Sequence, residues 1–228
     1  MEYDVVIVGG SPSGLATAIQ FAQLNKKNNT NLSICLLEKG SEIGAHILSG
    51  NVFQPNALDE LIPNWKDLGA PLNVPVKKDK IMYLLKNIGI PVPAFFMPNM
   101  KNHGNYIISL ANLCRWLGTQ AENLGVEIFP GFPASKLLFE DNRVIGVQTG
   151  DMGVSESGDL KDGHEPGINI KAKLTILGEG CRGHLGKQII EKFKLSEGKD
   201  PQHYGIGFKE VWKLKPELHD EGLVIHTN

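Results

Sequence analysis

The sequence predicts an α/β fold of the Rossmann type, in which helices join parallel strands. Its first sign is a short apolar run at positions 3–8, rich in β-branched residues, which is typical of a buried parallel strand. The second is a glycine-rich turn at positions 9–14, which leads into apolar residues at helical spacing. The third is another apolar run at positions 32–37, closed by Glu38. Together these segments predict a β-α-β unit.

The rest of the chain continues this alternation. Residues 109–124 are predicted to form a helix, with Ser109 as its N-cap and Gly125 just past its end. We expect strands at 126–129, 137–140, 144–148 and 173–177, and a helix at about 183–193. Residues 150–167 are rich in Gly, Asp, Glu and Ser, which favours a long solvated loop.

The nucleotide fold is interrupted in this sequence. Residues 51–106 contain many prolines and no clear helical run, and a further segment outside the nucleotide fold begins near residue 201. We therefore expect a discontinuous nucleotide-binding domain at 1–50 and 107–200. An inserted and incomplete second domain is expected at 51–106 and 201–228.

Composition narrows the function classes. With 41% hydrophobic residues, the 228-residue chain can bury a real core. The 23 basic and 25 acidic residues are nearly balanced, which argues against a nucleic-acid partner. The first strand starts almost at Met1, so we expect no targeting peptide. No run of about 18 apolar residues is present, so no membrane-spanning helix is expected.

Cysteine and histidine spacing gives no sign of a metal site within this chain. Cys35, Cys114 and Cys181 are far apart and odd in number, so neither a disulfide framework nor a cluster is expected, and reduced thiols facing the cytosol are the default. The seven histidines show no metal-ligand spacing. No nucleophile–base pair can be identified, so the sequence names no catalytic residue.

The turn at positions 9–14 has the pattern of a diphosphate-binding site. Gly9, Ser11 and Gly14 occupy the three slots of G-x-G-x-x-G, with Gly10 between them. The N–H groups at the helix start can hold a diphosphate. Glu38 follows Gly14 by 24 residues and can accept hydrogen bonds from an unphosphorylated ribose diol. Alternatively, the turn merely connects a strand to a helix.

Ser11 is a departure from the motif, whose middle slot normally holds glycine. A Cβ at the position of closest approach should crowd the diphosphate, although the hydroxyl could also donate to it. On the crowding argument, we expect Ser11→Gly to tighten cofactor binding.

A second glycine-rich turn favours FAD over NAD. The strand at 173–177 ends in Gly178-Glu179-Gly180 and is followed by a helix. This segment resembles the strand that follows a β-meander in many FAD enzymes of the glutathione-reductase-like fold. The resemblance implies that its backbone passes the ribityl–phosphate region of FAD. An ordinary strand-to-helix loop is the alternative.

An ordered series of short motifs makes the resemblance specific. The motifs are GAHILSG at 44–50, NHGNY at 102–106, TGDMG at 149–153, GEGCRG at 178–183 and YGIGFKE at 204–210. In order and over essentially the whole chain, they resemble the electron transfer flavoprotein–ubiquinone oxidoreductase family. The resemblance implies an FAD enzyme that takes single electrons from reduced electron transfer flavoprotein and passes pairs to ubiquinone at a membrane surface.

The resemblance also implies which parts lie elsewhere. In the family, the cysteines of the [4Fe–4S] cluster and a late segment of the flavin pocket are C-terminal. We therefore expect that Asn228, the last residue of this sequence, lies inside the substrate/quinone domain. We expect the protein to lie peripherally on the cytoplasmic face of a bacterial inner membrane. The matrix face of the mitochondrial inner membrane is the alternative.

The predicted cofactor contacts follow from the matched motifs. They comprise both glycine-rich turns, the residues at the end of the second strand and a stretch beside the flavin ring: Gly9, Gly10, Ser11, Gly14, Glu38, Lys39, His46, Ser49, Gly50, Gly178, Glu179 and Gly180. For His46, a structural role is an equal alternative.

An uncharged segment at 87–100 is the candidate for quinone and membrane contact. It is too short and too rich in proline to span a bilayer. Flanking lysines at 77, 78, 80, 86 and 101 suit anionic headgroups. The predicted contact residues are Ile90, Phe95, Phe96 and Met97. A loop packed on the protein's own core is the alternative.

Two rival functions stay open. One is a related FAD enzyme, similar to geranylgeranyl reductases or hydroxylases, which would lack cluster cysteines. The other is a non-catalytic nucleotide- or membrane-binding module that kept the fold without redox chemistry.

Overall fold

The computed structural model describes residues 1–93, 95, 97, 100–155 and 157–227. The chain forms two compact units, one of Met1–Ile47 with Cys114–Ile206 and one of Leu48–Leu113 with Gly207–Asn228. These boundaries lie near those expected from the sequence, 1–50 with 107–200 and 51–106 with 201–228.

The first unit is built on a six-stranded sheet with the order β8-β2-β1-β13-β10-β9. Its parallel strands are β8 (Glu127–Pro130), β2 (Ile34–Glu38), β1 (Glu2–Val8) and β13 (Asn169–Leu177). The remaining strands, β10 (Arg143–Thr149) and β9 (Ala134–Glu140), form an antiparallel hairpin that joins β13 through β10. The predicted α/β class, the β-α-β unit and the later hairpin are confirmed.

Three helices accompany this sheet, namely α1 (Pro12–Lys27), α3 (Leu110–Asn123) and α4 (His184–Lys192). Helix α1 starts at the N-cap Ser11, has Pro12 at its first position and ends with Lys26 and Lys27 in its last turn. Each of these suits the end of the helix at which it lies. Ser109 caps α3 by accepting a hydrogen bond from the N–H of Asn112, as predicted.

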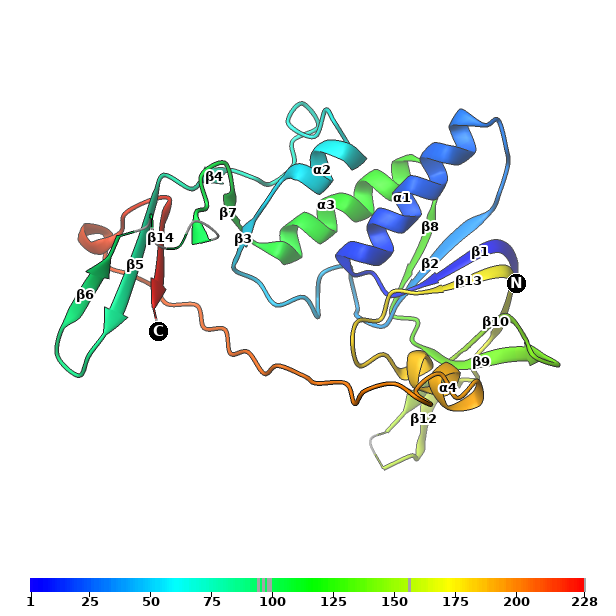
Figure 1. Cartoon of the computed structure of the whole chain (residues 1–228). Helices are drawn as coiled ribbons and strands as arrows, with labels where there is room; N and C mark the ends of the chain where they lie inside the picture. Colours follow the sequence, from blue (N-terminus) through cyan, green and yellow to red (C-terminus); the bar gives the residue numbers. More distant parts are fainter. Residues whose placement is uncertain (94, 96, 98–99, 156, 228) are drawn as a thin grey trace. The chain divides into compact units, whose positions relative to one another are not determined.

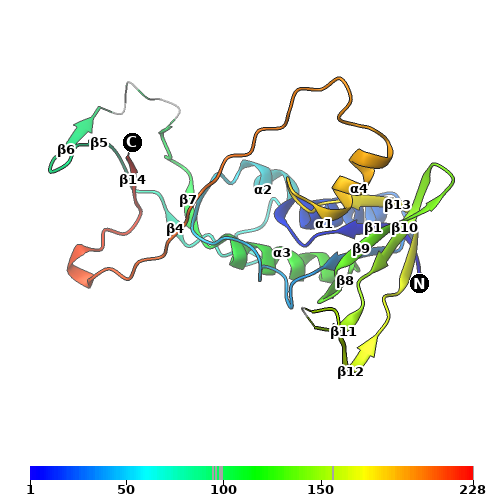
Figure 2. The same cartoon turned by 90° about the horizontal axis from the view of Figure 1, so that it is seen from below.

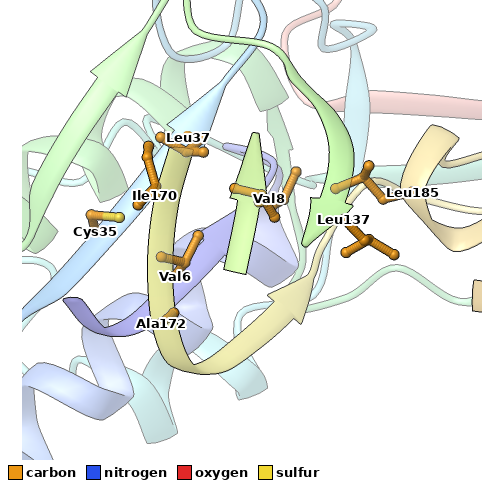
Figure 3. Packing of buried hydrophobic residues seen from close by; sticks show 9 residues of the cluster. Val6, Val8, Cys35, Leu37, Leu137, Ile170, Ala172 and Leu185 are labelled. Atoms are coloured by element: carbon orange, nitrogen blue, oxygen red, sulfur yellow. The ribbon is translucent and has the colours of Figure 1, made fainter. Parts of the chain in front are cut away.

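The central strands bury both faces, because their side chains alternate between two hydrophobic layers. On one face, the buried side chains come from β1, β2, β9, β10, β13 and α4, and Figure 3 shows Val6, Val8, Cys35, Leu37, Leu137, Ile170, Ala172 and Leu185 packed together. On the other face, Ile7 lies against α1, which runs along the sheet in Figure 1. Burying each such side chain contributes about 1.5–3 kcal/mol.

Two sequence predictions in the regions outside the core are wrong. Residues 150–167 were expected to be a loop, yet β11 (Met152–Val154) and β12 (Leu160–Glu165) form an antiparallel hairpin, which projects from the sheet in Figure 2. These strands are short and mostly polar, so they carry no alternating pattern. Residues 51–106 were expected to lack a helical run, yet they contain α2 (Asn56–Leu61). Trp65 donates a hydrogen bond to Asp59 of this short helix.

The second unit contains two small sheets. One has the order β3-β7-β4, formed by Asn51–Phe53, Tyr106–Ile108 and Val74–Pro75. The other has the order β14-β5-β6, formed by Leu223–Thr227, Lys78–Leu84 and Gly89–Val92. Within the described residues, no helix has the length and apolar character needed to cross a membrane.

Burial separates the three cysteines into two kinds. Cys35 and Cys114 are completely buried, and this burial raises the pKa of Cys35 to about 12 and that of Cys114 to about 11. Cys181 is exposed. A thiol reacts as its thiolate, so the two buried cysteines are both inaccessible and protonated near neutral pH.

We predict that iodoacetamide, applied to the folded chain at mildly alkaline pH, alkylates Cys181 alone. In urea, all three cysteines should react. Peptide mass spectrometry measures the alkylated fraction of each thiol. Rapid alkylation of Cys35 in the folded chain would contradict the buried position of β2.

Candidate functional site

A pocket of about 480 Å³ lies where β1, β2 and β13 end. In sheets of this type, ligands bind outside the carboxyl ends of the parallel strands. The pocket is lined by both glycine-rich turns, the end of β2, the start of β9 and residues 44, 46 and 47, and its polar or charged members are Ser11, Glu38, Lys39, His46, Ser135, Glu179, Arg182 and His184.

The glycines of the two turns are needed because the turns touch each other. A Cβ at Gly14 would overlap the carbonyl oxygen of Gly9. Gly9 has a φ of +105°, and a Cβ there would lie 2.6 Å from the carbonyl oxygen of Gly178. The N–H of Gly178 in turn donates to the carbonyl of Val8. Close backbone packing therefore requires glycine at Gly9 and Gly14, and a Cβ at Gly178 would lie only 3.2 Å from the carbonyl oxygen of Val8.

Ser11 connects the same two turns through its side chain. Its hydroxyl donates to the carbonyl oxygen of Gly178 at 2.8 Å and accepts from the N–H of Gly14 at 3.3 Å. A serine hydroxyl has one hydrogen to donate. The sequence had left open that the Ser11 hydroxyl donates to a diphosphate. In the structure, its hydrogen is used by the carbonyl of Gly178 instead.

Two backbone N–H groups remain for an anion at this turn. The N–H groups of Gly9, Gly10 and Gly14 donate to Leu37, Glu38 and Ser11, and Pro12 has no N–H. In the part of the chain that the structure describes, the N–H groups of Ser11 and Ser13 have no acceptor. They lie at the start of α1, where the helix dipole favours negative charge. This arrangement fits a diphosphate.

The Glu38 carboxylate is held firmly at the pocket wall. Its Oε2 accepts from the N–H of Gly10 and its Oε1 accepts from the N–H of Gly40, both at 2.7 Å. Its side chain is only 12% exposed, and Nδ1 of His46 lies 3.8 Å from Oε1. Each carboxylate oxygen can accept about two hydrogen bonds, so each retains one free site. The carboxylate can therefore accept from both hydroxyls of a ribose.

Glu179 has a role in the structure that the sequence did not indicate. Its carboxylate accepts from the N–H groups of His184, Leu185 and Gly186, at distances of 3.0–3.2 Å. It therefore caps the start of α4 and satisfies N–H groups there. Glu179 and Gly178 line the pocket, whereas Gly180 is not among the lining residues.

The predicted site residues Ser49 and Gly50 belong to the second unit. The Ser49 hydroxyl lies 2.5 Å from that of Ser109, and the carbonyl of Gly50 accepts from Lys209. Three residues, His46, Ser49 and Gly50, were predicted to lie beside the flavin. Of these, His46 lines the pocket, and its side chain is 57% exposed.

The sequence reasoning missed Arg182 and His184 as pocket residues. The guanidinium of Arg182 lies over the ring of Tyr204 at 5.0 Å, a cation–π geometry. A cation two residues after a glycine-rich turn is a signal that could have identified Arg182. No group of three or more potential metal ligands occurs among the described residues.

Comparisons of fold agree with this geometry. A family model described as "NAD(P)-binding Rossmann-like domain" matches residues 7–76. A geranylgeranyl bacteriochlorophyll reductase-like protein from Thermoplasma acidophilum is similar in structure, with a TM-score of 0.54 and 18% identity over 82% of this chain and 41% of that chain. The chondrochloren halogenase CndH, an FAD-dependent halogenase, gives a TM-score of 0.53, with 18% identity over 82% of this chain and 39% of its own. Fold and site thus define a dinucleotide-binding domain of the Rossmann type.

Sequence comparisons give the family. The chain is 55% identical to the electron transfer flavoprotein–ubiquinone oxidoreductase of Pseudomonas aeruginosa and 47% identical to the mitochondrial one of Bos taurus. These matches cover 100% and 99% of this chain but 42% and 37% of the relatives. Over its whole length, the chain is homologous to the N-terminal part of electron transfer flavoprotein–ubiquinone oxidoreductases, which confirms the resemblance of the motifs.

We predict that Gly14→Ala lowers the free energy of unfolding by about 1–3 kcal/mol, because the added methyl group meets the Gly9 carbonyl and forces the turn open. Gly186→Ala in α4 is the matched control, since a Cβ there meets nothing within 4 Å. The control should stabilise the chain by up to about 1 kcal/mol through helix propensity. Urea unfolding of the two variants measures both effects, and equal stability of the two would contradict the observed packing.

Proposed function

We propose that this chain is the FAD-binding part of an oxidoreductase that passes electrons from reduced electron transfer flavoprotein to ubiquinone. The observation that carries the proposal is the pocket, in which the glycine-rich turn before α1 lies beside the fixed Glu38 carboxylate. The whole chain is homologous to part of enzymes of that name. Bound FAD would supply chemistry that proceeds by one or two electrons, which links a one-electron donor to a two-electron quinone.

The residues of the pocket have separate roles in this proposal. The N–H groups of Ser11 and Ser13 hold the diphosphate, with Lys39 and Arg182 as nearby cations. Glu38 accepts from the adenosine ribose and, through its negative charge, disfavours a phosphorylated ribose. The backbone of Gly178 borders the ribityl–phosphate region. His46 lies at the pocket wall, where it can contact the flavin side of the ligand.

The [4Fe–4S] cluster of the proposed enzyme lies outside this chain. Two of the three cysteines are buried in the hydrophobic core, and the third is exposed beside the second turn. Electron transfer flavoprotein and ubiquinone are the proposed partners, because the names of the relatives state them. The relatives include bacterial and mitochondrial proteins, and we propose a peripheral location on the cytoplasmic face of a bacterial inner membrane.

We predict that the full chain binds FAD, giving a visible flavin spectrum that bleaches on reduction with dithionite. Glu38→Gln should weaken FAD binding about 10-fold to 100-fold, because hydrogen bonds to a charged acceptor contribute about 1.5–3 kcal/mol. Fluorescence titration measures the dissociation constants.

Glu122→Gln, an exposed carboxylate change in α3, is the matched control and should bind FAD as the unmodified chain does. A Glu38→Gln variant with unchanged FAD affinity would contradict the proposed ribose contact. A chain that binds a nucleotide but never bleaches would favour the non-catalytic module.

We also propose that the β5–β6 hairpin and the segment after it contact the membrane. Tyr83, Leu85, Ile88 and Ile90 are exposed on this hairpin, and Phe95, Met97 and Met100 are exposed after it. Phe96, a further predicted contact, lies outside the described residues. Lys77 and Lys78 pair with Glu221 and Asp220, whereas Lys80, Lys86 and Lys101 form no ion pair within the described residues. An apolar edge with neighbouring cations suits an anionic lipid surface.

We predict that Ile88→Asp combined with Phe95→Asp reduces co-sedimentation with phosphatidylglycerol-containing vesicles about tenfold or more, because each buried apolar side chain contributes about 1.5–3 kcal/mol. The two side chains are 65% and 70% exposed. Leu160→Asp is the matched control, since Leu160 is 67% exposed in the other unit. Unchanged sedimentation of the double variant would refute the membrane contact.

A further inference from the structure

The Ser11 side chain belongs to both glycine-rich turns at once. From the N-cap position of α1, its hydroxyl donates to the carbonyl oxygen of Gly178, the residue that follows β13, although the two residues are 167 positions apart in sequence. We propose that Ser11 is a positioning residue that fixes the spacing between the two turns around the pocket. This inference rests on the proposed FAD site.

The hydrogen bonds of this hydroxyl are complete without a ligand. It donates its one hydrogen to Gly178, and it can accept two hydrogen bonds. One comes from the N–H of Gly14 at 3.3 Å, and the other partner is the hydroxyl of Ser13 at 2.9 Å. Since the hydrogen of Ser11 is used by Gly178, Ser13 is the donor in that pair. Three protein partners keep the Ser11 side chain in one rotamer, and its bond to Gly178 connects the two turns.

Glycine, the residue that the motif normally has at this position, offers no such connection. The other links between the turns are the hydrogen bond from the N–H of Gly178 to Val8 and the close contact of Gly9 with Gly178. The Ser11 bond adds a second hydrogen bond, on the side of α1. A preformed spacing reduces the ordering cost that a ligand must overcome when it binds both turns.

This role predicts a difference between two ligands. In the proposed site, FAD would contact both turns, with the N–H groups of Ser11 and Ser13 holding its diphosphate and Gly178 beside its ribityl–phosphate region. ADP would contact only the first turn and Glu38. Loss of the Ser11 hydroxyl should therefore weaken FAD binding more than ADP binding. A change that merely frays the start of α1 would weaken both ligands alike.

The inference reverses the expectation from the sequence alone. That expectation had a Cβ at position 11 crowding the diphosphate, so that Ser11→Gly would tighten binding. In the structure, the Ser11 oxygen is bonded to Gly178, and its backbone has the extended φ of −78° and ψ of 167° of an N-cap. Ser11→Gly loses the connection between the turns and should weaken FAD binding.

The test compares dissociation constants for FAD and ADP in the full chain. Ser11→Ala keeps the Cβ and removes the hydroxyl, and it should weaken FAD binding about fivefold to tenfold, as expected for a lost hydrogen bond. The dissociation constant of the same variant for ADP should rise less than about twofold. Ser11→Thr keeps a hydroxyl on the Cβ and should bind FAD about as tightly as the unmodified chain does.

The matched control is Thr17→Ala, which removes the hydrogen bond from the Thr17 hydroxyl to the Ser13 carbonyl. This bond lies within α1 and does not connect the two turns. The control should leave both dissociation constants unchanged. Melting temperatures without ligand, measured on every variant, separate effects on folding from effects on binding, and Ser11→Thr keeps the test informative if Ser11→Ala unfolds.

The inference is overturned if Ser11→Ala and Ser11→Gly bind FAD as tightly as the unmodified chain or more tightly, or if FAD and ADP weaken to the same extent. It is also overturned if Ser11→Thr folds but does not restore FAD affinity. An unmodified chain that binds neither ligand would refute the proposed function itself, which is a different result from binding that the variants leave unchanged.

Discussion

Parallel pairing of β1 with both of its neighbours is the constraint on which the rest of the structure depends. Val8 is in register with Leu37 of β2 and with Leu177 of β13. Because the three strands run in the same direction, their carboxyl ends meet at one edge, and the two turns and Glu38 are brought together there. A ligand site is therefore a direct result of strand direction, and the glycines allow the turns to approach closely enough to form it.

Much of this first unit could be predicted from the sequence, because local signals and long-range packing agree there. The β-branched runs, the Ser11 cap with Pro12, and the lysines at the end of α1 each favour the element in which they occur. Glu38 could be assigned to the pocket because its distance from the first turn is set by one helix and one strand. The proposal that Glu38 contacts a ribose of the ligand rests on the same spacing.

The remaining features depend on contacts between distant residues, which a single sequence does not reveal. Glu179 matched a cofactor motif, but its carboxylate caps α4. The motif slot of Ser11 indicated a clash, whereas the partner of its hydroxyl, Gly178, is visible only once β13 lies beside β1. The β11–β12 hairpin has polar exposed strands, so its pairing leaves no hydrophobic pattern. In the second unit, short strands and many prolines likewise weaken local signals.

The chain order of the sheet also has a consequence for protein synthesis. β1 is made first, but its partner β13 ends at Leu177, after the whole inserted segment of the second unit and the β9–β10 hairpin. At about 5–20 residues per second, β1 waits roughly 10–30 s on the ribosome for that partner. Until then, the edge of β1 that pairs with β13 lacks its final neighbour. The pocket is therefore incomplete until the end of this interval, because Gly178, Glu179 and Arg182, which line it, are made only after β13.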